Sequence, residues 1–160
     1  MRSVHNDLLV AEPCALDIAQ LTFPEQLVLW SIRTWAETPG DAVLIHREMI
    51  RACGATSGSL AFAMLRCLLS MLARGGCRPT HCHRLACRVV GADEQAILGL
   101  IAASQADDRR YAEAQASQLV MPALRKPFLE AAVLLATTLD EAGWHLPPRY
   151  ALPRPGVPLH

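Results

Sequence analysis

Lysine, aromatic residues and net charge are all scarce in this chain of 160 residues. Lys126 is the single lysine against fourteen arginines, and Phe, Trp and Tyr together make up 5%. Basic and acidic residues cancel to a formal charge of zero, so overall charge gives no attraction to nucleic acid or to an anionic membrane. The longest uncharged stretch, residues 52–65, is too short and too polar to span a bilayer, and we expect no membrane partner.

The usual sequence signatures of enzymes are also missing. There is no G-x-S-x-G elbow, no Gly-rich phosphate-binding motif and no H-E-x-x-H zinc motif. No Glu precedes a His by three positions, as a di-iron helical bundle would require. Catalysis therefore has no support in the sequence. A secretory signal is absent as well, because residues 1–10 lack a long apolar run, and this predicts a cytoplasmic protein.

The chain does contain clear helical patterning. Hydrophobic residues make up 52%, enough for one compact core in a chain of this length. Strand-like alternation is nearly absent, and apolar residues recur at helical spacing between turn signals. We therefore predict an all-α fold, a single irregular bundle of five to six helices. The expected helices cover about residues 22–37, 41–52, 56–74, 93–105, 108–120 and 122–142.

The first expected helix has a defined start and two expected faces. Thr22 and Glu25 have the spacing of a capping box, in which each side chain bonds the backbone of the other residue. Apolar residues form one broad face of the following helix, and Arg33 and Glu37 lie on the opposite, polar face.

The sequence also indicates which helix is central and where the helical domain ends. The 56–74 segment, which includes Cys67, is apolar nearly all round and is expected to be the central buried helix. The helical domain is expected to span residues 1–143, with 1–21 partly irregular. Residues 144–160 contain five of the eleven prolines and are expected to form an extended tail, either lying along the domain or offering a proline-rich peptide to an aromatic groove.

A cluster of cysteine and histidine lies between the third and fourth expected helices. Residues 77–87 read Cys-Arg-Pro-Thr-His-Cys-His-Arg-Leu-Ala-Cys, with five metal-ligating side chains. Zn²⁺ prefers thiolate and imidazole, and four such ligands make a closed structural site. Alternate side chains of an extended loop share a face, so we predict zinc bound by Cys77, His81, His83 and Cys87, with Cys82 as a substitute ligand. The ion would replace apolar contacts that a polar loop cannot make.

Two other interpretations of this loop stay open, because its spacings match no standard zinc motif. Cysteine is often simply a small buried apolar residue, and the histidines would then be solvated loop residues with no cofactor. Alternatively, Cys82 or Cys87 next to Arg84 or Arg88 would favour a reactive thiolate. That arrangement would suit a small redox enzyme or metalloenzyme.

Charge is unevenly distributed along the chain. Residues 49–92 contain six arginines and no acidic residue, between flanks in which acidic residues predominate. The candidate partner-binding residues are Arg74, Arg78, Arg84 and Arg88. They predict an acidic protein partner, unless they pair with the acidic flanks of the same chain. Nucleic-acid binding through residues 74–88 is a further alternative, weakened by the lack of an aromatic platform there.

These observations favour a non-catalytic helical module for protein interaction or regulation, with structural zinc in the 77–87 loop. A metal- or thiol-dependent enzyme that uses the same loop is the alternative from a different class.

Overall fold

The computed structural model describes residues 15–149, which form the predicted all-α bundle. No β-strand forms within that range, and two isolated bridges are the extent of β pairing there. Each predicted helix is present, and the start predicted at Pro122 belongs to a 3₁₀ helix, η4 (Pro122–Leu124). The α-helices are α1 (Phe23–Glu37), α2 (Ala42–Cys53), α3 (Ala55–Gly75), α4 (Ala92–Gln105), α5 (Arg109–Leu119) and α6 (Arg125–Glu141).

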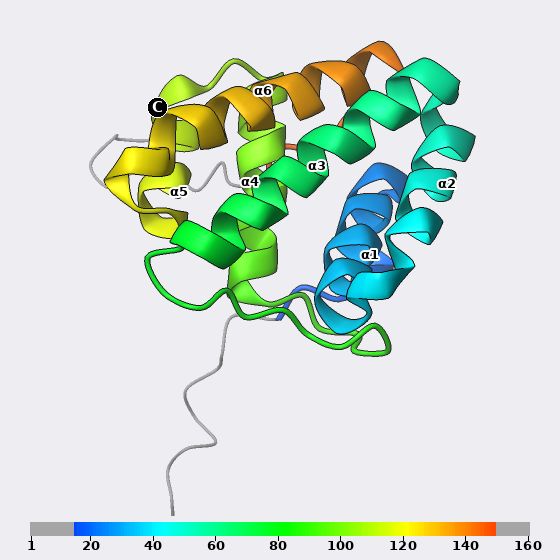
Figure 1. Cartoon of the computed structure of the whole chain (residues 1–160), viewed down its shortest axis with the longest axis horizontal. Helices are drawn as coiled ribbons and strands as arrows, with labels where there is room; N and C mark the ends of the chain where they lie inside the picture. The colour runs from blue at the N-terminus through cyan, green and yellow to red at the C-terminus, as the bar shows by residue number, and fades with distance from the viewer. Residues whose placement is uncertain (1–14, 150–160) are drawn as a thin grey trace, which may run out of the picture.

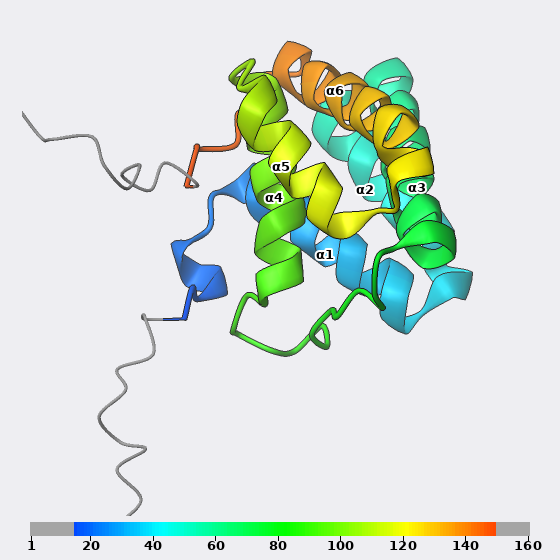
Figure 2. The same ribbon diagram turned by 90° about the vertical axis from the view of Figure 1, so that its left-hand side faces the viewer.

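Helix α3 lies between α2 and α6, which run along its two sides (Figure 1). Helix α4 packs against α5, α6 and α1, and a quarter turn of the molecule shows α4 and α5 side by side (Figure 2). All six helices contribute side chains to one apolar core, mostly Leu, Ile and Ala. Burial of this continuous core is the main stabilising contribution to the fold.

Local signals in the sequence account for several helix ends. The Glu25 carboxylate accepts a hydrogen bond from the Thr22 backbone N–H at 2.7 Å, which satisfies a donor at the start of α1 as the capping box predicts. Gly54, between α2 and α3, has a φ of 86°, and Gly143, after α6, has a φ of 87°. Side chains disfavour this left-handed conformation, so glycine ends a helix there at little cost.

Helix α2 crosses α3 unusually closely. A Cβ built at Gly58 of α3 would lie 2.5 Å from the Ile50 Cα and 2.6 Å from the Met49 carbonyl oxygen, both in α2. Only a residue without a side chain fits at such a distance from backbone atoms. Gly58 is therefore a packing requirement of the bundle.

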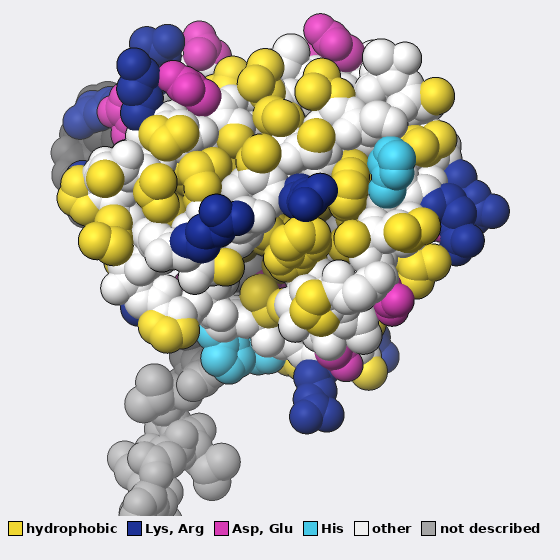
Figure 3. All heavy atoms as spheres, viewed as in Figure 1, with side chains coloured by type: hydrophobic (Ala, Val, Ile, Leu, Met, Phe, Trp, Pro, Cys, Tyr) yellow, Lys and Arg dark blue, Asp and Glu magenta, His cyan; other side chains and the backbone are white. Residues whose placement is uncertain are grey.

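Helix α3 is not buried all round. Leu60 is 44% exposed and Cys67 is exposed, so the expectation that Cys67 packs in the core is wrong. On this face hydrophobic side chains gather over α3 and α6, while acidic side chains lie toward the edges (Figure 3). By length and composition alone α3 could also cross a membrane, and 33% of its most apolar window is buried. A central bundle helix that keeps one open face has the same properties.

Residues 144–149 follow α6 without regular structure and pack against the bundle. The Trp144 indole N–H donates to the Ala52 carbonyl at 2.8 Å, and Leu146 is buried. Arg149 forms an ion pair with the buried Glu25 at 2.6 Å. Residues 144–149 are therefore part of the packed bundle. The rest of the expected tail, residues 150–160, and the N-terminal residues 1–14 lie outside the described residues.

Candidate functional site

Residues 76–91 connect α3 to α4 as an irregular loop that contains the Cys/His cluster. The loop runs along one edge of the bundle, past α1 (Figures 1 and 2). Backbone hydrogen bonds hold both of its ends, from the Cys77 N–H to the Leu119 carbonyl at 3.1 Å and from the Val90 N–H to the Leu16 carbonyl at 2.8 Å. These contacts fix where the loop begins and ends.

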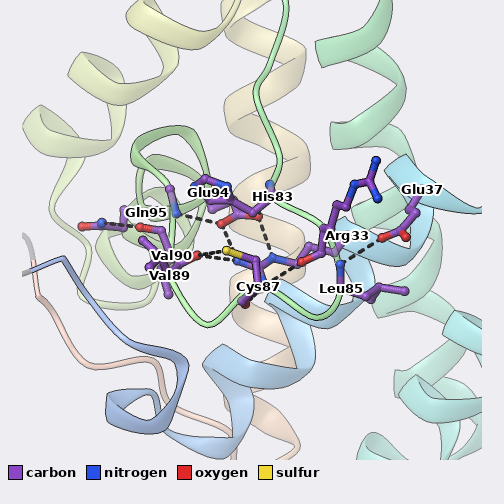
Figure 4. Close-up of polar contacts among 11 residues, drawn as sticks. Arg33, Glu37, His83, Leu85, Cys87, Val89, Val90, Glu94 and Gln95 are labelled. Atoms are coloured by element: carbon purple, nitrogen blue, oxygen red, sulfur yellow. Dashed lines mark hydrogen bonds and ion pairs between the residues drawn. The ribbon is translucent and has the colours of Figure 1, made fainter.

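A buried ion pair lies behind the centre of the loop. Arg33 of α1 and Glu94 of α4 are 1% and 0% exposed, and the guanidinium donates to both carboxylate oxygens at 2.8 and 2.9 Å (Figure 4). Arg33 is therefore buried, although the sequence places it on the polar side of α1. A bidentate pair of this kind offsets the large cost of removing both charges from water.

The same two side chains also bond the loop backbone. The Arg33 guanidinium donates to three loop carbonyls at 2.5 to 3.2 Å, those of Arg84, Cys87 and Val89. The Glu94 carboxylate accepts from two loop N–H groups at 2.8 and 3.0 Å, those of Gly91 and His83. We call this set of contacts the Arg33–Glu94 hub. It bonds five backbone groups of the loop, and one of these, the Arg84 carbonyl, also accepts from the Cys87 N–H at 2.9 Å.

A second ion pair holds the start of the loop. The Arg78 guanidinium donates to both carboxylate oxygens of Asp93 in α4, and the His81 N–H donates to the same carboxylate at 2.7 Å. On the α1 side, Glu37 accepts from the Leu85 N–H at 2.9 Å (Figure 4). Asp93 and Glu94 sit in the first turn of α4, where the helix dipole favours them, and they also organise the loop.

Both α4 carboxylates are held in the ionised form. The Arg78 guanidinium and the His81 N–H keep the pKa of Asp93 below its ordinary value, against the opposing effect of burial. Burial raises the pKa of Glu94, but the hydrogen bonds from Arg33 and Gly91 outweigh it, and the net pKa is lowered. The stability they contribute is therefore complete above the unfolded pKa of about 4 and is lost as pH falls through the lower folded values.

The predicted zinc ligands are spread along the loop. Cys77 is exposed, with its Sγ 3.8 Å from a carbonyl of α5, and the Cys87 Sγ lies 3.7 Å from the carbonyl two residues on. The structure does bring the rings of His81 and His83 together, edge to face with centroids 5.3 Å apart. Within residues 15–149 no three His, Cys, Asp or Glu side chains lie close enough to share an ion.

The substitute ligand Cys82 is half-buried beside the hub. Burial, reinforced by the negative charges of Glu94 and Asp93, raises the pKa of its thiol to about 11, although Arg33 acts in the opposite direction. A thiol with this pKa carries very little thiolate at neutral pH. The shift is opposite in direction to the one that a redox-active Cys82 requires.

The four candidate partner-binding arginines fall into two groups. Arg78 pairs with Asp93, and the Arg88 Nε lies 3.5 Å from the Asp17 carboxylate, so two of them pair within the chain. Arg74 and Arg84 have exposed side chains, and neither has an ion pair with another residue in the 15–149 range. Half of the four arginines predicted to bind a partner are therefore already paired within the chain.

A groove lies between α5 and α6, where the sequence predicted no functional site. This groove has a volume of about 1340 Å³, and Leu129, Val133 and Leu134 supply part of its apolar lining. Val133 and Leu134 are 48% and 49% exposed. The sequence did indicate an exposed apolar face on this helix. All six residues from 131 to 136 are apolar, which is more than one core-facing stripe of a helix needs.

Comparison with known proteins adds no relative: no family model matches the chain, and no similar protein is found among curated proteins or solved structures.

Proposed function

We propose that this chain is a non-catalytic helical module that binds a partner protein, and that the α5–α6 groove is its binding surface. The observation that carries the proposal is the exposed apolar lining of the groove, where Val133 and Leu134 are each about half exposed. Soluble proteins seldom leave a contiguous apolar surface of this kind uncovered unless it binds something.

The size of the groove favours a helical segment of the partner. Its volume of about 1340 Å³ exceeds the roughly 300–1,000 Å³ of ordinary small-molecule sites. Helix α5 has 11 residues and is therefore about 16 Å long, the length of three turns of a partner helix. An amphipathic helix could place its apolar face against Leu129, Val133 and Leu134, with polar residues toward water.

The charged residues that line the groove indicate which charges a partner should carry. Four basic and four acidic residues line it, so a partner of strong net charge has no advantage. At one end, however, the Arg125 Nε is buried and has no hydrogen-bond acceptor among the described residues, and Lys126 lies beside it. A buried donor without a partner is unfavourable, so an acidic residue of the partner helix would be stabilised there. The proposed partner therefore needs one acidic residue at this end of the groove and no overall acidity, and it binds away from the 74–88 segment where the sequence placed an acidic partner.

Site-specific cross-linking tests this proposal. A photoreactive residue at Leu134 should cross-link one partner in the cells that make the protein, and one at Val43 of α2 should not. Val43 is the matched control because it is 75% exposed and outside the groove. The captured protein is then identified, purified and titrated calorimetrically against wild type, Leu134→Glu and Val43→Glu. We expect Leu134→Glu alone to weaken binding, by about 30-fold.

Two results would exclude the groove as the binding surface. One is equal cross-linking from positions 134 and 43. The other is binding of the purified protein to Leu134→Glu with the affinity of the wild type.

A second candidate is a metal-binding function of the 77–87 loop, which the ring contact between His81 and His83 favours. For this candidate we expect about one zinc per chain after growth with zinc. Cys77→Ser, Cys87→Ser and treatment with a chelator should each lower the melting temperature. Cys67→Ser on the exposed face of α3 is the control and should leave it unchanged. An unchanged melting curve in both loop variants and in chelator would remove this candidate.

A further inference from the structure

An aromatic pair lies at the surface where α1 begins and α6 ends. The rings of Phe23 and Trp144 have centroids 4.8 Å apart at an interplanar angle of 47°. Phe23 is 53% exposed, and the hydrogen bond from the Trp144 indole to the Ala52 carbonyl fixes the orientation of that ring. An exposed aromatic side chain held in one orientation is more typical of a binding surface than of a core.

The pair borders a shallow pocket of about 270 Å³ that Ala52, Glu48 and Arg51 complete. Proline rings pack well on aromatic side chains, and a proline-rich segment is already extended before it binds, so it loses little entropy. Glu48 pairs with the exposed Arg47 and Arg51, at 3.7 and 3.3 Å, and such surface pairs exchange readily. The pocket therefore has the features needed to bind a proline-rich segment that also carries an arginine.

The described chain ends close to this pocket. Arg149 pairs with Glu25, two residues after Phe23, and also donates to the Gln20 carbonyl at 2.7 Å. The sequence that follows, residues 150–160, reads Tyr-Ala-Leu-Pro-Arg-Pro-Gly-Val-Pro-Leu-His. Eleven extended residues reach roughly 34 Å, at about 3.1 Å per residue. Attachment to the same molecule also gives the segment a high effective concentration at the pocket.

We propose that residues 150–160 bind in this pocket of their own chain, with prolines against Phe23 and Trp144 and Arg154 beside Glu48. The occupant contains three prolines that can pack on the two rings, and one arginine that can exchange with Arg51 beside Glu48. The site is independent of the α5–α6 groove, because the two share no lining residue. External proline-rich peptides would have to displace the chain's own segment before they could bind.

A benzophenone analogue of phenylalanine in place of Phe23 tests the proposal in the full chain. After irradiation and trypsin digestion, we expect the analogue joined to the peptide 150–160, since trypsin cleaves after Arg149 but not between Arg154 and Pro155. The product should migrate as a monomer. Pro153→Ser together with Pro158→Ser, which leaves the Arg154–Pro155 bond resistant to trypsin, should lower the yield about tenfold, with the helical circular dichroism spectrum unchanged. The same analogue at Val43, which is exposed but away from the pocket, is the control.

Three results would overturn the proposal. They are no cross-link to residues 150–160, an equal yield from position 43, or a cross-linked dimer in which the segment comes from a second copy. A partner that fails to bind the α5–α6 groove would affect none of these measurements.

Discussion

Arg33→Met lowers the free energy of unfolding by about 3–5 kcal/mol, because it leaves the Glu94 carboxylate buried without its counter-ion. Replacing both members of a buried pair by apolar residues often restores stability, but here we expect Arg33→Met combined with Glu94→Leu to stay destabilised. The three carbonyls and two N–H groups of the loop would still lose the hydrogen bonds that the hub provides. Urea denaturation followed by circular dichroism measures both variants.

The control for this prediction is Arg47→Met. Arg47 is exposed and its Nε lies 3.7 Å from Glu48, so its loss should change stability by less than about 0.5 kcal/mol. If Arg33→Met were as mild as this control, the hub would not be a stabilising element.

Gly58→Ala lowers the free energy of unfolding by about 3 kcal/mol, although alanine is the better helix former by about 1 kcal/mol. The added methyl would lie 2.5 Å from the Ile50 Cα, so α2 must move away from α3 and the contacts around the crossing loosen. Thermal and urea denaturation measure the loss.

Gly99→Ala in α4 is the matched substitution at a site with room for a methyl group. A Cβ there would meet the Tyr111 ring at 3.4 Å, an ordinary contact, so the helix-propensity gain should remain and stability should be unchanged or slightly raised. Equal effects of the two substitutions would show that helix propensity, and not the close crossing, determines the result at Gly58.

The helices of this protein could be predicted from its sequence because their signals are local. Capping residues, glycines with positive φ and apolar residues at helical spacing each act within a few positions, and they gave bounds within three residues of those observed. The apolar character of the 56–74 segment correctly indicated that this helix is central in the bundle. The prediction that the helix is buried all round was wrong, because composition does not show which face a neighbouring helix covers.

The hub could not be predicted, because its two charges are 61 residues apart in the chain. A single arginine opposite an apolar face normally indicates solvent, and two acidic residues at a helix start are explained by the dipole alone. The zinc prediction considered the residues of the 77–87 loop alone. Asp93, Glu94 and Arg33, which bond the loop, all lie outside that segment and could not enter such a prediction.

The Arg33–Glu94 hub makes the order of the loop conditional on the relative position of two helices. One partner comes from α1 and the other from α4, and both reach the loop only while those helices stay docked. A ligand or substitution that shifts α1 against α4 by a few ångströms would therefore release several loop hydrogen bonds at once. In thermodynamic terms the loop and the α1–α4 contact are coupled, so the state of the Cys/His segment reports on a helix contact made elsewhere in the bundle.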